Sequence, residues 1–235
     1  MLATFGRPPL SARMNDMAVL NYLHEINRLW GFLGAPREGG MSTVSRNRLI
    51  NAIIFFAQNT HFCGKIKLFK LLYLLDFENF SHTGKSVTGF EYQAWKFGPV
   101  PIELMQEWEG LNADLASVVY IEEERIIDYV RQTVKVREGV IFDGDDFTPR
   151  QINIMRGLAD RYSNTRSPTM IDVTHEQNGA WDKVWHGGQG AFKTIPYDLA
   201  VPEDAPNRAD ILEIAAEEAM YQAALEAENN GQYAH

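Results

Sequence analysis

The stretch KIKLFKLLYLLDFENF, Lys65–Phe80, decides the fold because it is apolar on almost every side of a helix. A helix at a protein surface carries its apolar residues on one face, whereas a helix that is apolar all round is buried. We therefore predict that residues 65–80 form a central helix, which the rest of the domain covers.

Further helices are predicted on both sides of this segment. Ser45 is a candidate N-cap for a preceding helix, and Pro101 suits the first position of a following one. The residues TPRQ at 148–151 combine a capping box with a proline at the first helical position. Ser167-Pro168 starts another helix, and an alanine-rich acidic helix is expected over residues 210–228.

The segments that the sequence predicts as strands are short. Residues 90–97 alternate enough to form a strand, which GPVP at 98–101 is expected to stop. Residues 118–142 are rich in β-branched side chains and predict two or three antiparallel strands. The expected fold class is therefore α+β: a mainly helical domain around a buried central helix, with a small antiparallel sheet.

The distribution of charged residues and of proline and glycine divides the chain into three parts. Residues 1–40 are broken by proline and glycine and read as an N-terminal extension, in which Met17 to Trp30 could form an amphipathic helix. Residues 41–199 form the predicted domain. Residues 200–235 hold eight acidic residues against Arg208, so this tail carries −7 of the formal −9. An acidic tail suits a basic partner, although a solvated tail is the commoner explanation.

Composition excludes several classes of protein. Of the 235 residues 45% are apolar, which is enough for a globular core. Cys63 is the single cysteine, so no internal disulfide forms; we expect a small core or boundary residue rather than a nucleophile. No apolar stretch is long enough to cross a membrane, and we see no secretion signal, which predicts a cytoplasmic protein. The acidic balance argues against nucleic-acid binding.

Charged residues in the central helix need partners. Asp76 lies in an otherwise apolar segment, where a structural pair with Lys70 or Tyr73 is expected in preference to a catalytic base. Lys65, Lys67 and Lys70 crowd the first turns, where cations oppose the helix dipole. They indicate either an anionic partner, such as the acidic tail, or a solvated basic end.

Three features suggest chemistry. Gly84-Lys85-Ser86 resembles part of a phosphate loop, but position 79 is Asn where a glycine is required, and a helix precedes the motif. Asp172, His175 and His186 could belong to a metal-dependent hydrolase, although no histidines share the spacing of ligands on one helical face. The tryptophans are core residues or contact anchors; the four considered are Trp95, Trp108, Trp181 and Trp185.

The order of motifs resembles a known family. KLFKLLYLLD at 67–76 is followed by TGKSVTG at 83–89, by Tyr92, and by FGPVP at 97–101. This order resembles the Panacea domain of the SocA-like antitoxins, also described as phage-associated proteins. The resemblance runs from about residue 46 to residue 185, and His175 with Trp181 looks like the closing element of that family. Asn178-Gly179-Ala180 stands where a proline is expected before the tryptophan.

The resemblance implies an antitoxin of a bacterial, prophage-associated toxin–antitoxin system, which neutralises a cognate toxin by direct binding. It implies no catalytic residue, cofactor or metal. The implied partners are a protein toxin, basic if the acidic tail contacts it, and a cytosolic protease if the chain acts as a proteolytic adaptor; the alternative is the metal-dependent hydrolase. The candidate motif and partner-binding residues are Lys67, Lys70, Tyr73, Asp76, Gly84, Gly89, Tyr92, Trp95, Gly98, Pro99, Pro101, His175 and Trp181.

Overall fold

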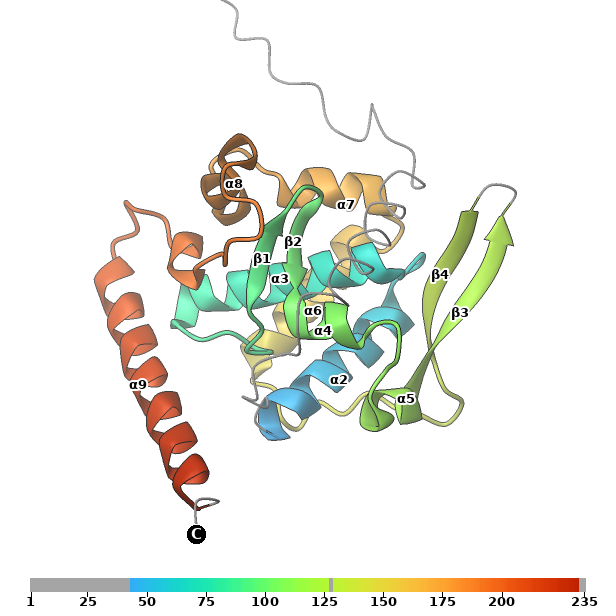
Figure 1. Cartoon of the computed structure of the whole chain (residues 1–235), viewed down its shortest axis with the longest axis horizontal. Coiled ribbons are helices and arrows are strands. Elements are labelled where there is room, and N and C mark those ends of the chain that lie inside the picture. The colour runs from blue at the N-terminus through green and yellow to red at the C-terminus, as the bar shows by residue number, and fades with distance from the viewer. Residues whose placement is uncertain (1–42, 127–128, 233–235) are drawn as a thin grey trace, which may run out of the picture.

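The computed structural model describes residues 43–126 and 129–232 (Figure 1). The predicted extension 1–40, with its helix Met17 to Trp30, lies outside the described residues. The helices are α2 (Thr43–Asn59), α3 (Lys65–Thr83), α4 (Ile102–Glu107), α5 (Ala113–Val118), α6 (Pro149–Tyr162), α7 (Ser167–Thr174), α8 (Ala180–Trp185) and α9 (Arg208–Gln232). The strands are β1 (Tyr92–Trp95), β2 (Gly98–Pro101), β3 (Val119–Ile126) and β4 (Tyr129–Val136), and two 3-10 turns are η2 (His186–Gly188) and η3 (Tyr197–Ala200).

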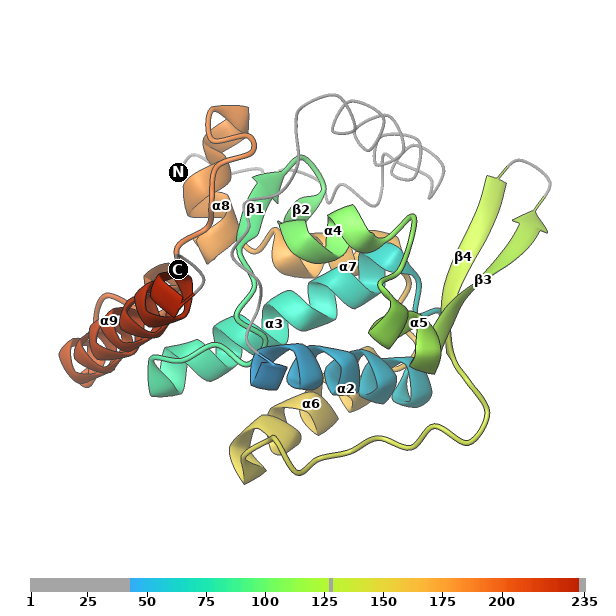
Figure 2. The ribbon, with the colours of Figure 1, turned by 60° about the horizontal axis from the view of Figure 1, so that its bottom comes forward.

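Helix α3 is the centre of the domain, as the sequence predicts. Leu68, Leu71, Leu72 and Leu75 are at most 1% exposed. Helices α2, α6 and α7 and the β1–β2 hairpin surround α3 (Figures 1 and 2). Each leucine buried in this way contributes about 1.5–3 kcal/mol relative to an exposed one. The mainly helical α+β class is confirmed.

The strands form two separate hairpins rather than one sheet. Strand β1 pairs antiparallel with β2, and β3 pairs with β4. The prediction that residues 98–101 stop a strand is wrong, because they form β2 themselves, with Tyr92 opposite Pro101. Gly98 makes the tight turn at φ +99°, and a strand paired on one edge only tolerates proline. Residues 140–142 are outside any strand, so the second hairpin has two strands.

Helix boundaries follow the predicted caps in part. Thr148 and Gln151 form the predicted capping box at the start of α6, each side chain bonded to the other's backbone N–H. Helix α7 begins at Ser167, as expected. Ser45 is not an N-cap, because the chain is already helical at Thr43. Pro101 is the N-cap position of α4 rather than its first helical residue, since β2 extends to it.

Helix α9 contacts the end of α3 through its N-terminal half and lies at the edge of the molecule (Figure 1). Ile211 packs with Phe80 and Val201 in a small cluster separate from the main core. The backbone of α9 approaches Gly84, the left-handed C-cap of α3, so closely that a Cβ there would lie 2.5 Å from the Ile211 carbonyl oxygen. Lys85 Nζ lies 2.6 Å from a carboxylate oxygen of Glu218. The turn after α3 is therefore the surface on which α9 packs.

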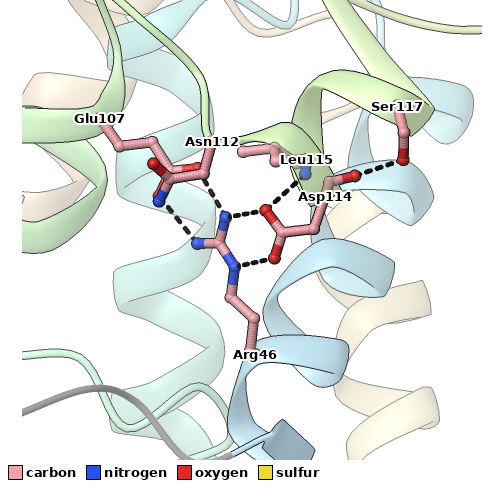
Figure 3. A network of polar contacts seen from close by, with 6 residues as sticks. All are labelled: Arg46, Glu107, Asn112, Asp114, Leu115 and Ser117. Atoms are coloured by element: carbon pink, nitrogen blue, oxygen red, sulfur yellow. Dashed lines mark hydrogen bonds and ion pairs between the residues drawn. The ribbon is translucent and has the colours of Figure 1, made fainter.

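An ion-pair network joins α2 to the α4–α5 segment (Figure 3). The Arg46 guanidinium donates two hydrogen bonds to Asp114, both 2.7 Å long, and two to Glu107, at 2.7 and 2.8 Å. These bonds raise the pKa of Arg46. The hydrogen bonds from Arg46 lower the pKa of Asp114 to about 2. Paired, bidentate contacts of this kind are stronger than single ion pairs.

We predict a pH-dependent contribution from Asp114. Because its folded-state pKa is lowered, its stabilising effect is present above about pH 4 and is lost as the pH falls toward 2. The Asp114 side chain is 46% exposed, so solvent screening limits the effect to about 1 kcal/mol. Asp114→Asn should reduce the free energy of unfolding at pH 7, and the difference from wild type should shrink below about pH 4. Asp204→Asn is the control; a pH-independent difference for Asp114→Asn contradicts the prediction.

Gly84→Ala is expected to loosen α9. The substitution forces a Cβ both onto a left-handed backbone, φ +69°, and against the α9 backbone, and such strain costs about 1–3 kcal/mol. Amide hydrogen exchange in the first turns of α9 should accelerate about tenfold or more. Gly157→Ala, where a Cβ meets nothing within 4 Å, is the matched control. Unchanged exchange in α9 of the Gly84→Ala variant would show that this contact does not hold the helix.

Candidate functional site

The motif residues converge on α3, and the carboxylate of Asp76 is their common anchor. Asp76 is 0% exposed and accepts hydrogen bonds from the backbone N–H groups of Val87 and Thr88, each 2.7 Å long. It also accepts bonds from the hydroxyls of Thr88 and Tyr92. Burial raises the pKa of Asp76, and the four hydrogen bonds oppose that rise. The predicted pair with Lys70 or Tyr73 is wrong, because the turn after α3 folds back over the helix and supplies the donors.

Lys70 holds strand β2 of the β1–β2 hairpin, whereas Asp76 holds β1 through Tyr92. Its Nζ is buried and donates a 2.8 Å hydrogen bond to the carbonyl oxygen of Pro99. Burial lowers the pKa of Lys70 well below its usual value. A Cβ at Gly98 would lie 2.6 Å from this Nζ and 2.8 Å from the hydroxyl of Thr174. Gly98 is therefore required both by its positive φ and by the closeness of the lysine.

The other two lysines of α3 also bind inside the protein. The solvated basic end is therefore wrong for both, whereas the predicted anionic partner is found for Lys65, as Glu109 rather than the acidic tail. Lys67 is 0% exposed and donates to the carbonyl oxygens of His61 and Ser163. Lys65 is 4% exposed and lies 3.5 Å from a carboxylate oxygen of Glu109. Burial lowers the pKa of both lysines to about 8. These cations neither face solvent nor meet the acidic tail, because local carbonyls and one glutamate take their hydrogen bonds.

His175 and Trp181 form a stacked pair beside α3. Their ring centroids are 3.6 Å apart and the planes are almost parallel, at 3°. The indole N–H of Trp181 donates to the carbonyl oxygen of Trp95, 3.0 Å away. Nε2 of His175 is buried without a hydrogen-bond partner, and burial lowers the pKa of His175 to about 3. The imidazole is therefore neutral at physiological pH and acts as a flat packing group.

The described part of the chain offers no metal centre. Across residues 43–126 and 129–232, no group of three His, Cys, Asp or Glu side chains could hold a metal ion, so Asp172, His175 and His186 are not assembled into one. Cys63 is buried, and burial raises the pKa of its thiol to about 11, which disfavours a nucleophile. The metal-hydrolase alternative gains no support from this geometry.

Most of the candidate residues lie in the interior. Gly89 is exposed, with φ +79°, and His175 is half-buried. Of the tryptophans, Trp185 is partly buried and the other three considered are buried. The buried candidates are Lys67, Lys70, Tyr73, Asp76, Gly84, Tyr92, Trp95, Gly98, Pro99, Pro101 and Trp181.

A groove beside these residues was missed by sequence reasoning. It has a volume of about 690 Å³ and lies between one face of α3, the segment 173–183 and the segment 199–203. Leu74, Glu78 and Ser81 supply the α3 face. These residues follow one another at helical spacing, and Glu78 is a charged residue in an apolar helix. That spacing could have indicated an accessible strip along α3. The other two sides of the groove, residues 173–183 and 199–203, are distant in sequence and are brought together only by the fold.

Asp76→Asn is expected to destabilise the protein by about 3 kcal/mol, because the amide N–H₂ would face donors and leave buried groups unpaired. Chemical denaturation measures the loss, and amide exchange at Val87 and Thr88 should accelerate with it. Asp160→Asn, at an exposed position on α6, should change stability by less than about 0.5 kcal/mol. A loss for Asp76→Asn no larger than that of the control would show that the four hydrogen bonds do not hold the turn.

Comparison with known proteins finds one family similar to part of the chain. A family model described as antitoxin SocA-like, Panacea domain, matches residues 68–182. No curated protein and no solved structure matches the chain. Within the described residues, no helix is long and apolar enough to cross a membrane. The matched span begins in α3 and ends in α8. It therefore contains Asp76, the turn after α3, the β1–β2 hairpin with its turn, and the His175–Trp181 pair. The chain is therefore similar to the SocA-like Panacea family over residues 68–182.

Proposed function

We propose that this protein is an antitoxin that neutralises a cognate protein toxin by binding it directly, without catalysis. The observation that carries the proposal is the match of residues 68–182 to the antitoxin SocA-like Panacea family. An antitoxin of this family has a protein partner. We therefore expect the functional residues to lie on the surface rather than in a catalytic pocket. The acidic balance of the chain favours a basic toxin, since complementary charge speeds encounter.

The buried motif residues serve this function as a scaffold. Asp76, Lys70 and Gly98 are inside the protein, so a partner cannot reach them without unfolding the domain. They fix the turn after α3 and the β1–β2 hairpin relative to the helix. We therefore divide the chain into an N-terminal extension at 1–40, a scaffold at 41–199 and an acidic helical tail at 200–235, with recognition assigned to surfaces that the scaffold positions.

Helix α9 is the first such surface. Its outer turns expose Ile214, Met220 and Tyr221 by 40%, 67% and 60%. Tyr221 follows Ile214 by seven residues, so both lie on one face of the helix, with Glu217 and Glu218 between them. A helix that exposes apolar residues beside acidic ones can bind in a groove of a basic partner. Ile214 lies beside Gly84 and Glu218 pairs with Lys85, so Met220 and Tyr221 are the exposed apolar residues beyond the contact with the domain.

Substitution of the exposed apolar residues of α9 should weaken toxin binding. In the full-length chain, Met220→Gln with Tyr221→Gln keeps good helix formers and leaves the Ile211 anchor in place. We expect affinity for the product of the neighbouring reading frame to fall about tenfold or more, because tyrosine is a frequent binding hot spot and methionine is enriched in interfaces. Titration calorimetry and rescue of growth on co-expression measure the effect. Ile141→Gln, at a residue 82% exposed elsewhere, is the control.

The same co-expression experiment separates blocking from delivery to a protease. If the protein only blocks its toxin, the half-life of the toxin is unchanged or longer when both are present. A proteolytic adaptor would instead shorten that half-life in a protease-dependent way. Undiminished affinity of the α9 variant removes the helix from the interface, and failure of the wild-type chain to rescue growth removes the antitoxin proposal.

A further inference from the structure

We propose that the groove between α3, residues 173–183 and residues 199–203 is a second recognition site, which binds a basic, extended segment of a protein partner. The groove lies in the part of the molecule where α3, α8 and the segment leading to α9 meet (Figure 1). The identification of the toxin as the donor of that segment rests on the proposed function. The binding of a basic peptide segment does not.

The floor of the groove is aromatic and rigid. Tyr73 and Phe77 line it, and their ring centroids are 4.1 Å apart. Phe77 is backed by Tyr197, whose ring centroid is 4.7 Å away. Both floor residues are only 6% exposed, because they are packed from below, and Leu74 adds an accessible aliphatic surface. Such a floor suits an apolar side chain or the alkyl stem of a lysine or arginine.

The rim of the groove is negative. Three exposed carboxylates line it, from Glu78 on α3, Glu176 after α7 and Glu203 after η3. Lys183 is the single basic residue among the lining residues, so they carry a formal net charge of −2. Among the described residues, none of these three carboxylates takes part in an ion pair. They are therefore available to a cation from outside the chain.

Size and charge together select the occupant. A volume of about 690 Å³ is in the range of specific binding sites and accommodates a few side chains. The carboxylates come from three separate segments and frame an apolar floor, an arrangement that fits a chain with alternating basic and apolar residues better than a point charge. The alkyl stem of a basic side chain can pack on this floor while its charged head reaches a carboxylate at the rim. Phosphate backbones would be repelled by the same rim.

The groove joins the family domain to the rest of the chain. The α3 residues of the groove and most of its lining from segment 173–183 belong to the matched residues 68–182. The lining residues Leu199, Ala200, Pro202 and Glu203 lie outside the match. Tyr73 is itself a motif residue. Recognition in this groove would therefore combine a floor fixed by the motif with a wall supplied by a segment outside it.

A peptide-binding experiment on the full-length protein tests the groove directly. The probe is a fluorescent pentapeptide with arginine, leucine and lysine at its centre; the comparison peptide has glutamates in place of the basic residues, and spermidine serves as a free polycation. We expect the basic peptide to bind, the acidic peptide not to bind, and the amide signals of Leu74, Gly179 and Ala180 to shift. Raising the salt concentration should weaken binding.

Two variants locate the site. Glu176→Gln with Glu203→Gln should weaken the basic peptide about five- to tenfold, whereas Glu138→Gln with Asp160→Asn, a charge-matched pair outside the groove lining, should change affinity less than twofold. Ser81→Trp places a bulky ring in the groove without changing charge and should abolish binding while the circular dichroism spectrum is retained. Equal affinity for the acidic peptide, equally effective competition by spermidine, or undiminished binding by both groove variants overturns the inference.

Growth rescue separates this inference from the proposed function. If Ser81→Trp loses the peptide and also loses rescue against the neighbouring gene product, the groove holds a toxin segment. If it loses the peptide but rescues fully, the toxin is not the donor and that part of the inference fails. If the wild-type chain never rescues, the antitoxin proposal fails, and the peptide titration alone decides the groove.

Discussion

The burial of the Asp76 carboxylate is the constraint on which the domain depends. Removing a carboxylate from water costs several kcal/mol unless hydrogen bonds replace those of the solvent. Two backbone N–H groups and two hydroxyls provide them, and they come from the turn after α3 and from β1. The turn must therefore fold back along the helix, which brings Tyr92 and the β1–β2 hairpin against α3. Lys70 fixes the other strand of the same hairpin through the Pro99 carbonyl.

The buried cations of α3 follow the same logic. A lysine in the first turn of a helix opposes the dipole by a few tenths of a kcal/mol, but the cost of leaving a buried carbonyl oxygen unpaired is about 1–3 kcal/mol. Lys67 donates to the carbonyls of His61 and Ser163, which belong to the chain segments before α3 and after α6, and it is the side-chain donor that pairs the His61 carbonyl, whereas the Ser163 carbonyl also accepts from the His61 N–H. The larger of the two effects decides the arrangement, so the lysines join loops to the central helix.

The interior and the surface consequently have different tasks. The motif that relates this chain to the SocA-like family is mostly inside the molecule, where it determines the paths of the turn and hairpin. The exposed face of α9 and the acidic groove are outside the interior network, although Gly84 seats α9 and Tyr73 forms part of the groove floor. A scaffold of this kind can hold a constant core while its recognition surfaces change. That division is consistent with a protein that binds another protein.

What the sequence by itself determined is the local structure. The all-round apolar pattern of residues 65–80 predicted the buried helix, and the capping box at 148–151 located the start of α6, because both signals depend on neighbours in the chain. The motif order was also sufficient to recognise the family. Tertiary structure alone decided the partners of Asp76 and of the α3 lysines, the pairing of residues 98–101 as a strand, and the assembly of the groove. Those outcomes depend on groups distant in sequence, whose approach is set by packing and by the cost of unpaired buried charge rather than by any local pattern.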